Sequence, residues 1–206
     1  MTAHHAIVHR GKVEAKDTVF VFGLGGLGLN AVQILLAIGA RVIVSDTRQG
    51  PLDEAVRLGV LEQDVVPVGS SIPEFVGKHQ LSIDIVADFV CIPQTFSNAQ
   101  EIGKQSSHSC PPTTSTDLFL VRHGGTILAI GLLGPEIPLN TLACVFKQVD
   151  IKFCYGGHTS DIADGLDLIV NGKLTPRVEE AKLEEFPRVL QDLHEGKIKS
   201  RMALIP

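Results

Sequence analysis

Short apolar runs alternate with segments of helical periodicity along most of the chain. Runs rich in Val, Ile and Phe predict buried strands at residues 18–22, 41–45, 64–68, 83–88, 126–130 and 150–155. Apolar residues at helical spacing predict helices at residues 26–38, 52–58, 71–78, 94–102 and 139–148. Because the strands are almost continuously apolar and helices separate them, we expect right-handed βαβ units and a parallel sheet covered on both faces. The predicted fold class is α/β with a doubly wound parallel sheet.

Two segments depart from this alternation. Residues 103–120 begin with a Ser/Thr/Pro-rich stretch without periodicity, which is typical of a surface loop. After Gly157 the pattern predicts a helix at 161–170, a turn at Asn171-Gly172, an extended segment at 175–179, a helix at 184–193 and a closing strand at 201–205. We therefore expect a sheet domain over residues 1–157, with the loop as an insertion, and a C-terminal helical tail with a closing strand over 158–206.

Composition limits the classes of partner. The 206 residues are 44% hydrophobic and 20% charged, as in an ordinary globular protein. A net charge of −5 argues against a general attraction to nucleic acid or to anionic membranes. No apolar run approaches the length of a membrane span, and residues 1–12 lack the apolar core of an export signal. We expect a cytoplasmic protein that acts on a small molecule.

Cysteine and histidine spacing predicts no metal site. Cys91, Cys110, Cys144 and Cys154 form no C-x-x-C pair, and we expect reduced, mostly buried thiols. His4 and His5 are the only adjacent histidines, and neighbouring side chains on a regular element point apart, so this pair is a poor chelate by spacing alone.

A glycine cluster carries the clearest chemistry. Gly23, Gly25 and Gly28 fit the pattern G-x-G-x-x-G, with Gly26 and Leu27 between them. The first glycine permits a tight turn, the second lets backbone approach a diphosphate, and the third lets helix and strand pack closely. The following helix offers unpaired N–H groups to the phosphates. A glycine-rich turn without a ligand is the alternative, but the preceding strand and following helix are the context that a dinucleotide site requires.

An acid ends the second predicted strand. Asp46 stands 23 residues after Gly23, where its carboxylate would accept hydrogen bonds from the adenosine ribose and favour NAD. Arg48, two residues later, could bind the additional phosphate of NADP. NAD is therefore the predicted cofactor, with NADP left open.

Ordered blocks along the chain resemble one family. "HAIVHRGKVEAKDTVFVFGLGGLGLNAVQILLAIGARVIVSD", "IDIVADFV", "VRHGGTILAIGLLG", "IKFCYGG" and the segment from "DGLDLIV" to "RMALIP" are similar, in order, to the zinc-type alcohol dehydrogenases of the medium-chain dehydrogenase/reductase family. The resemblance covers the Rossmann-type cofactor domain and a short C-terminal remnant of the catalytic domain. Only residues 103–120 fall outside it.

The resemblance implies further cofactor contacts. Phe89 and Val90 would lie beneath the adenosine ribose and towards the nicotinamide. The nicotinamide pocket would be lined by Ile130, Gly131 and Leu132. Tyr155 would lie nearby, and Arg201 would reach a cofactor phosphate. For the apolar residues, a role in the core is an equally good interpretation. For Arg201, an equally good interpretation is a solvated position at the surface. In the family, the strand from Ile151 to Tyr155 pairs with its symmetry mate, which implies a homodimer.

Departures from the family leave the catalytic residues unknown. The family's zinc ligands come from a preceding domain, and this chain begins where that domain ends, so no zinc ligand set is visible. His158 could be a substitute acid or base, although a solvated loop histidine is the simpler interpretation. Residues 103–120 interrupt a helix of the family, and Cys110 within them is expected to be an exposed, idle thiol. Cys91 stands where a glycine is usual.

Three functions remain open from the sequence. The first is an NAD(P)-dependent oxidoreductase that transfers hydride to or from a small carbonyl, alcohol or enone without its own zinc site. The second is a dehydrogenase scaffold reused by a non-redox enzyme, such as an isomerase, dehydratase or cyclase. The third is a non-catalytic nucleotide-binding or dimerisation module.

Overall fold

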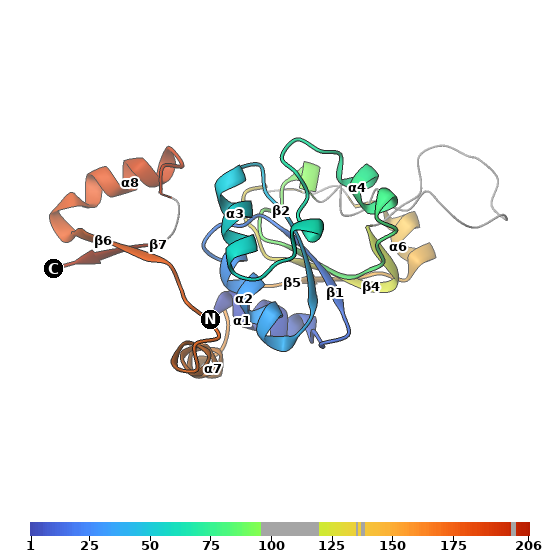
Figure 1. Ribbon diagram of the computed structural model, residues 1–206, viewed down its shortest axis with the longest axis horizontal. Helices are drawn as coiled ribbons and strands as arrows, with labels where there is room; N and C mark the ends of the chain where they lie inside the picture. Colours follow the sequence, from blue (N-terminus) through green and yellow to red (C-terminus); the bar gives the residue numbers. More distant parts are fainter. Residues whose placement is uncertain (96–119, 135, 137–138, 199–200) are drawn as a thin grey trace.

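A computed structural model describes residues 1–95, 120–134, 136, 139–198 and 201–206. Its centre is a five-stranded sheet in the order β2-β1-β3-β4-β5, and every neighbouring pair is parallel. Figure 1 shows this sheet among the helices. The strands are β1 Thr18–Phe22, β2 Arg41–Ser45, β3 Ile83–Asp88, β4 Val121–Ala129 and β5 Asp150–Phe153. The chain leaves β1 for β2 on one side and later reaches β3 on the other, so the switch point of the sheet lies between β1 and β3. Ligands of such sheets bind at the carboxyl ends of the strands at this point.

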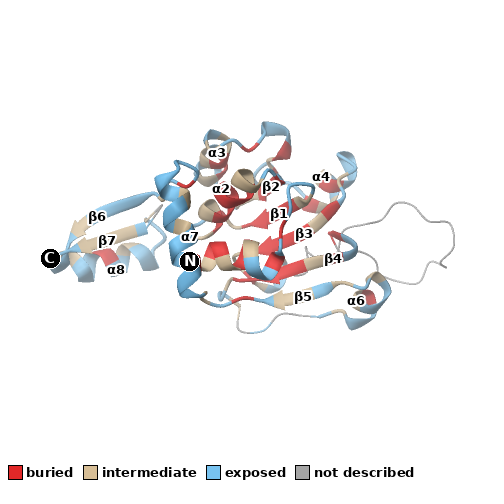
Figure 2. Ribbon diagram, turned by 90° about the horizontal axis from the view of Figure 1, so that it is seen from below, coloured by how far each residue is buried: buried red, intermediate tan, exposed pale blue. Residues whose placement is uncertain are grey.

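Helices cover both faces of the sheet. They are α1 Thr2–His4, the π-helix η1 His5–Gly11, α2 Gly28–Ile38, α3 Gln49–Arg57, the 3₁₀ turn η2 Glu62–Asp64, α4 Ile72–Lys78, α6 Thr141–Lys147 and α7 Thr159–Val170. Because side chains alternate along a strand, Val19 and Val21 pack with the core under η1, α2 and α3, whereas Phe20 and Phe22 pack with the core under α4 and α6. Figure 2 shows the buried residues concentrated in these strands. The predicted doubly wound α/β fold is confirmed.

Two local predictions were wrong or incomplete. Residues 64–68 form no strand: η2 is followed by a single parallel bridge between Val65 and Val44. Pro67 has no N–H to continue a ladder, and Asp64 is instead held by Arg41 at 2.6 Å. The helical turns at residues 2–11 were not predicted. The predicted helix at 94–102 lies mostly, and Cys110 entirely, outside the described residues.

The C-terminal segment forms a small unit of its own beyond α7. Strands β6 Val178–Lys182 and β7 Arg201–Ile205 pair in parallel, and η3 Leu183–Glu185 and α8 Phe186–His194 connect them. In Figure 1 this unit stands to one side of the main sheet. It approaches the main body through Arg177, 3.7 Å from Glu54, and through Arg201, which lies against Gly26. The predicted helix and closing strand of the tail are confirmed, whereas a domain boundary after residue 157 stays a prediction. No described helix is long and apolar enough to cross a membrane.

Candidate cofactor site

The glycine turn joins β1 to α2 through contacts that leave no room for side chains. Gly23 has φ of 81°, the left-handed region that favours glycine, and a Cβ there would lie 2.4 Å from Val90 Cγ2. A Cβ on Gly28 would lie 1.9 Å from the carbonyl oxygen of Gly23. These two glycines are therefore required for the fold itself, because the helix starts directly against the end of the strand.

The middle of the turn has a different environment. A Cβ on Gly25 would meet no heavy atom within 4 Å, so the fold alone does not require glycine there. No side chain caps α2 at Leu27, and the first N–H groups of a helix lack intrahelical partners. Beside this opening, a Cβ on Gly26 would lie 2.5 Å from Arg201 Nε. Open space, a helix N-terminus and a guanidinium thus meet at one point, which is a suitable environment for a diphosphate.

Asp46, at the end of β2, supports the turn as well as facing the site. Its Oδ2 accepts a hydrogen bond from the Leu24 amide at 2.8 Å. Its Oδ1 accepts from the Arg48 amide at 2.9 Å and from Arg48 Nε at 3.1 Å. A ribose hydroxyl that reached this carboxylate would therefore compete with the Arg48 guanidinium, and the two predicted specificity residues form a single unit.

The other wall of the site follows β3 and β4. The amides of Ile130 and Gly131 donate to the Asp88 carbonyl at 2.9 and 3.1 Å. A Cβ on Gly131 would lie 2.2 Å from the carbonyl carbon of Val90, so the two loops touch backbone to backbone. Leu132 follows with 77% of its surface exposed. This close contact brings the predicted residues of the two loops together at the carboxyl edge of the sheet.

Asp88, which was not among the predicted site residues, organises the loop after β3. It is fully buried; its Oδ1 accepts from the amides of Val90 and Cys91, and its Oδ2 accepts from the Thr95 hydroxyl at 2.8 Å. Burial raises the pKa of this carboxyl, although the hydrogen bonds from Cys91, Thr95 and Val90 oppose the change. The available signal was an acid at the end of a buried strand, the same signal that identified Asp46.

Cys91 closes this loop in a strained conformation. Its φ of 51° lies in the left-handed region, which explains why a glycine is usual at this position. Its Sγ donates to the Asp88 carbonyl at 3.3 Å, and burial together with the charge of Asp88 raises the thiol pKa to about 12. Cys91 and Cys154 are buried free thiols, as predicted, and Cys144 is partly buried.

The predicted residues do not all meet at one place. The glycine turn lies together with Asp46, Val90 and Arg201, and the Gly131 loop lies against Val90. Tyr155, by contrast, follows the end of β5 with 86% of its surface exposed, so it packs little against the body. His158 lies at the start of α7, its ring centroid 5.0 Å from that of His5.

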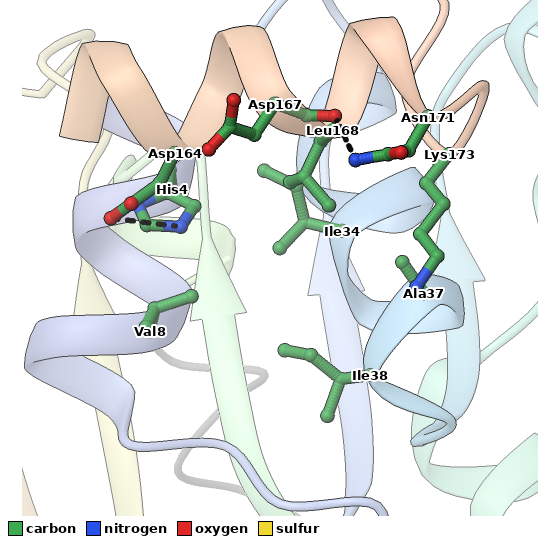
Figure 3. A pocket seen from close by; sticks show the side chains of 10 residues that line it. All are labelled: His4, Val8, Ile34, Ala37, Ile38, Asp164, Asp167, Leu168, Asn171 and Lys173. Carbon is green, nitrogen blue, oxygen red and sulfur yellow. Dashed lines mark hydrogen bonds and ion pairs between the residues drawn. The ribbon is translucent and has the colours of Figure 1, made fainter.

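Two hollows lie near these elements. One of about 30 Å³ lies between α2 and the C-terminal unit, where Gly26, Asn30 and Arg201 line it. A larger cavity of about 270 Å³ lies between η1, α2 and α7, with apolar walls from Val8, Ile34 and Leu168 (Figure 3). The larger cavity is lined by none of the predicted cofactor residues.

Comparison with known proteins identifies relatives over nearly the whole chain, although no protein-family model matches it. The alcohol dehydrogenase of Geobacillus stearothermophilus is 27% identical over 194 residues, which cover 91% of this chain and 50% of that protein. The structure of an alcohol dehydrogenase from Aeropyrum pernix matches with a TM-score of 0.80 and 26% identity, covering 100% of this chain and 55% of that one. Acetophenone reductase from Geotrichum candidum, solved in complex with NAD, matches with a TM-score of 0.78 and 27% identity, covering 100% and 52%.

The chain therefore spans about half the length of the proteins that it matches. The structural matches extend over the whole chain, from the first helix through the sheet to the C-terminal unit, and the scaffold resembles that of these oxidoreductases. The resemblance that the ordered sequence blocks indicated is confirmed: over nearly its whole length the chain is similar to alcohol dehydrogenases of the medium-chain dehydrogenase/reductase type, about half of whose length it spans.

Proposed function

We propose that the chain binds a nicotinamide dinucleotide at the glycine turn and acts as an oxidoreductase of the alcohol dehydrogenase type. The observation that carries the proposal is the open space at Gly25, in front of the uncapped N-terminus of α2 and beside Arg201. The similar acetophenone reductase, solved with NAD, supports it. The substrate class is a small carbonyl, alcohol or enone, and the proposal does not require the family's zinc ligands from this chain.

The residues present fit such a cofactor. The backbone of Gly25 and Gly26 would contact the diphosphate, with Arg201 as a counter-charge. Asp46 would accept from the adenosine ribose, and the backbone of residues 130–132 would line the nicotinamide end. The cofactor supplies the hydride chemistry when bound, and the protein supplies binding and orientation.

The choice between NAD and NADP would depend on the pair of Asp46 and Arg48. The carboxylate would accept from two ribose hydroxyls of NAD and repel the extra phosphate of NADP. Arg48 could turn from the carboxylate towards that phosphate, since its side chain is half-exposed. We propose NAD as the preferred cofactor.

Gly25 provides the sharpest test of cofactor binding. Gly25→Val should fold normally, because a Cβ there meets nothing, but its side chain would occupy the place of the diphosphate. We expect NADH affinity, measured by fluorescence titration, to fall at least about tenfold, equivalent to about 1.4 kcal/mol. Gly165→Val on α7 is the matched control, since a Cβ at Gly165 also meets no atom within 4 Å. Equal NADH affinity in the Gly25 variant and the wild type would refute the proposed site.

Redox activity needs a separate measurement. The purified chain with NADH or NADPH, with and without Zn²⁺, should oxidise the cofactor in the presence of some member of a panel of carbonyls and enones. If the chain binds the reduced cofactor but the absorbance of that cofactor at about 340 nm does not fall, the non-redox or non-catalytic alternatives are favoured.

We also propose a second copy of this chain as the partner of β5. This strand is the edge of the sheet, and Phe153 on it is 64% exposed. The Cys154 amide donates to Ala129, so the Phe153 amide points towards the open edge. Phe153→Pro should therefore shift the mass measured by light scattering from dimer to monomer. Phe186→Glu on α8 is the control, and a monomeric wild type would exclude the pairing.

A further inference from the structure

Four histidines surround one buried carboxylate where the first helix meets α7. His4, His5 and His9 come from α1 and η1, whereas His158 and Asp161 come from the start of α7. The ring centroids of His4 and His5 lie 5.8 and 5.6 Å from that of His9. Asp161 is completely buried between them, and residues 4 and 161 are 157 positions apart in the sequence.

The π-helix explains why these side chains converge. His4 and His9 are five residues apart, and in an α-helix of 3.6 residues per turn they would point in clearly different directions. The i→i+5 ladder of η1 widens the turn and returns His9 to the side of His4. The expectation that adjacent His4 and His5 would diverge was therefore incomplete, because each reaches a different oxygen of Asp161.

The two oxygens of Asp161 have separate partners. Oδ2 accepts from the His158 amide at 2.7 Å and lies 3.0 Å from His5 Nδ1, which together fix the carboxylate. Oδ1 lies 2.7 Å from His4 Nδ1 and 3.4 Å from His9 Nε2. Burial alone would raise the pKa of Asp161, but the hydrogen bonds from His4, the His158 amide and His5 outweigh it and lower the pKa to about 2. The carboxylate is therefore ionised at neutral pH.

We propose that His4, His9 and Asp161 bind a zinc ion. One ligand atom from each residue lies within 4.8 Å of the others. Two imidazole nitrogens and one carboxylate oxygen are a ligand set that Zn²⁺ accepts, with bonds of about 2.0–2.2 Å and a tetrahedral arrangement. Such ligand atoms stand about 3.4 Å apart in a zinc site, so His4 Nδ1 and Asp161 Oδ1, now 2.7 Å apart, must separate, and His9 must adjust to complete the site. His9 can make this movement, because its side chain is 43% exposed.

The surroundings of His4 suit a metal ligand. If Nδ1 binds the ion, the ring proton moves to Nε2, which lies 4.0 Å from Asp164 Oδ2. A carboxylate that faces the second nitrogen of a ligating histidine is the usual support for such a ligand. Figure 3 shows His4 and Asp164 side by side at one end of the larger cavity. Solvent beside the exposed His9 can supply the fourth ligand.

Zinc at this place would join the first helical turns to α7. Two ligands belong to residues 4–9 and the third to residue 161, so binding would couple segments that are distant in sequence. The site is separate from the proposed cofactor site, because none of the three ligands belongs to the glycine turn or to the loops after β3 and β4. Its test is therefore independent of NADH binding.

The first experiment measures metal binding directly. The full chain, free of any affinity tag and stripped with a chelator, is titrated with Zn²⁺ by calorimetry and with Co²⁺ by visible absorption. We expect saturation at one ion per chain and at least about a tenfold loss of affinity in His9→Ala, since loss of even a supporting residue costs 10–100-fold at typical sites. His194→Ala, which removes an exposed histidine of α8, is the matched control and should bind as the wild type does.

A stability measurement separates metal binding from packing. Because an ion that binds only the folded chain raises its melting temperature, Zn²⁺ should stabilise the wild type and His194→Ala but not His9→Ala. His9→Gln keeps a polar side chain at the exposed position and should behave like His9→Ala. Unchanged affinity and the same zinc-induced stabilisation in both His9 variants, or no saturable binding by the wild type, would overturn the proposal.

Discussion

The glycine turn and the histidine cluster are built in opposite ways. The turn is one continuous stretch, in which six residues from Gly23 to Gly28 determine the geometry, and its contacts with Asp46 and Val90 follow from adjacent parallel strands. The cluster joins residues 4–9 to residue 161 around a single carboxylate. A local motif can be recognised from spacing, whereas a group assembled across the chain can be recognised only in the folded molecule.

The largest effect is expected within the turn. Gly28→Ala would place a Cβ 1.9 Å from the Gly23 carbonyl oxygen, a backbone atom that cannot move without separating α2 from β1. We expect the free energy of unfolding, from urea denaturation, to fall by about 3 kcal/mol or more, or the variant to be insoluble. Gly25→Ala should change it by less than about 0.5 kcal/mol. Similar losses in the two variants would mean that the turn is not divided into packing and binding positions.

In the histidine cluster, substitution of the buried Asp161 should lower the free energy of unfolding more than substitution of the half-exposed Asp164. Asp161→Ala leaves His4, His5 and the His158 amide without their buried acceptor, and such unsatisfied groups cost about 1–3 kcal/mol. We expect a loss of about 2–3 kcal/mol in chelator-treated protein by urea denaturation. Asp164→Ala, whose side chain is half-exposed, should cost less than about 0.5 kcal/mol. A loss of that small size in Asp161→Ala would show that the histidines find other partners.

Two substitutions of Asp46 distinguish its support of the glycine turn from its recognition of the cofactor. Asp46→Asn keeps an acceptor for the Leu24 amide but removes the charge, whereas Asp46→Ala removes both. Both variants should reduce the preference for NADH over NADPH by about tenfold in fluorescence titrations. Only Asp46→Ala should also lose about 1 kcal/mol of stability. An equal loss of affinity for both cofactors would mean that the acid only supports the turn.

The smallest expected effect is the contribution of Cys91 to the pH dependence of the free energy of unfolding. Its folded pKa of about 12 lies above the ordinary value of 9.0, so its contribution to stability is present below pH 9 and is lost as the pH rises towards 12. Between pH 8 and 10 the thiolate of the unfolded chain should cost the wild type about 1 kcal/mol that Cys91→Ser does not lose. Urea denaturation at both pH values compares the two chains. Equal losses of stability in the wild type and in Cys91→Ser would mean that the Cys91 thiol ionises readily in the folded state.

The sequence predicted most of the main elements because their patterns are local. β1, β2 and β3 have the predicted bounds, and α2 begins two residues after its predicted start. The failure at residues 64–68 has one local and one tertiary cause: the apolar run was given more weight than Pro67, and Asp64 finds its partner Arg41 on the neighbouring strand β2. The π-helix at 5–11 has no established pattern of its own, so His9 could not be placed beside His4 in advance.

By itself, the sequence determined the parallel sheet, the glycine turn and the similarity to alcohol dehydrogenases, because apolar periodicity and the glycine spacing are properties of neighbouring residues. Tertiary structure alone decided that Arg201 lies against Gly26, that Asp88 is buried beneath the loop after β3, and that Asp161 is enclosed by histidines. The physical reason is that each of these depends on distances between atoms from separate elements, which are fixed only when the helices close onto the sheet.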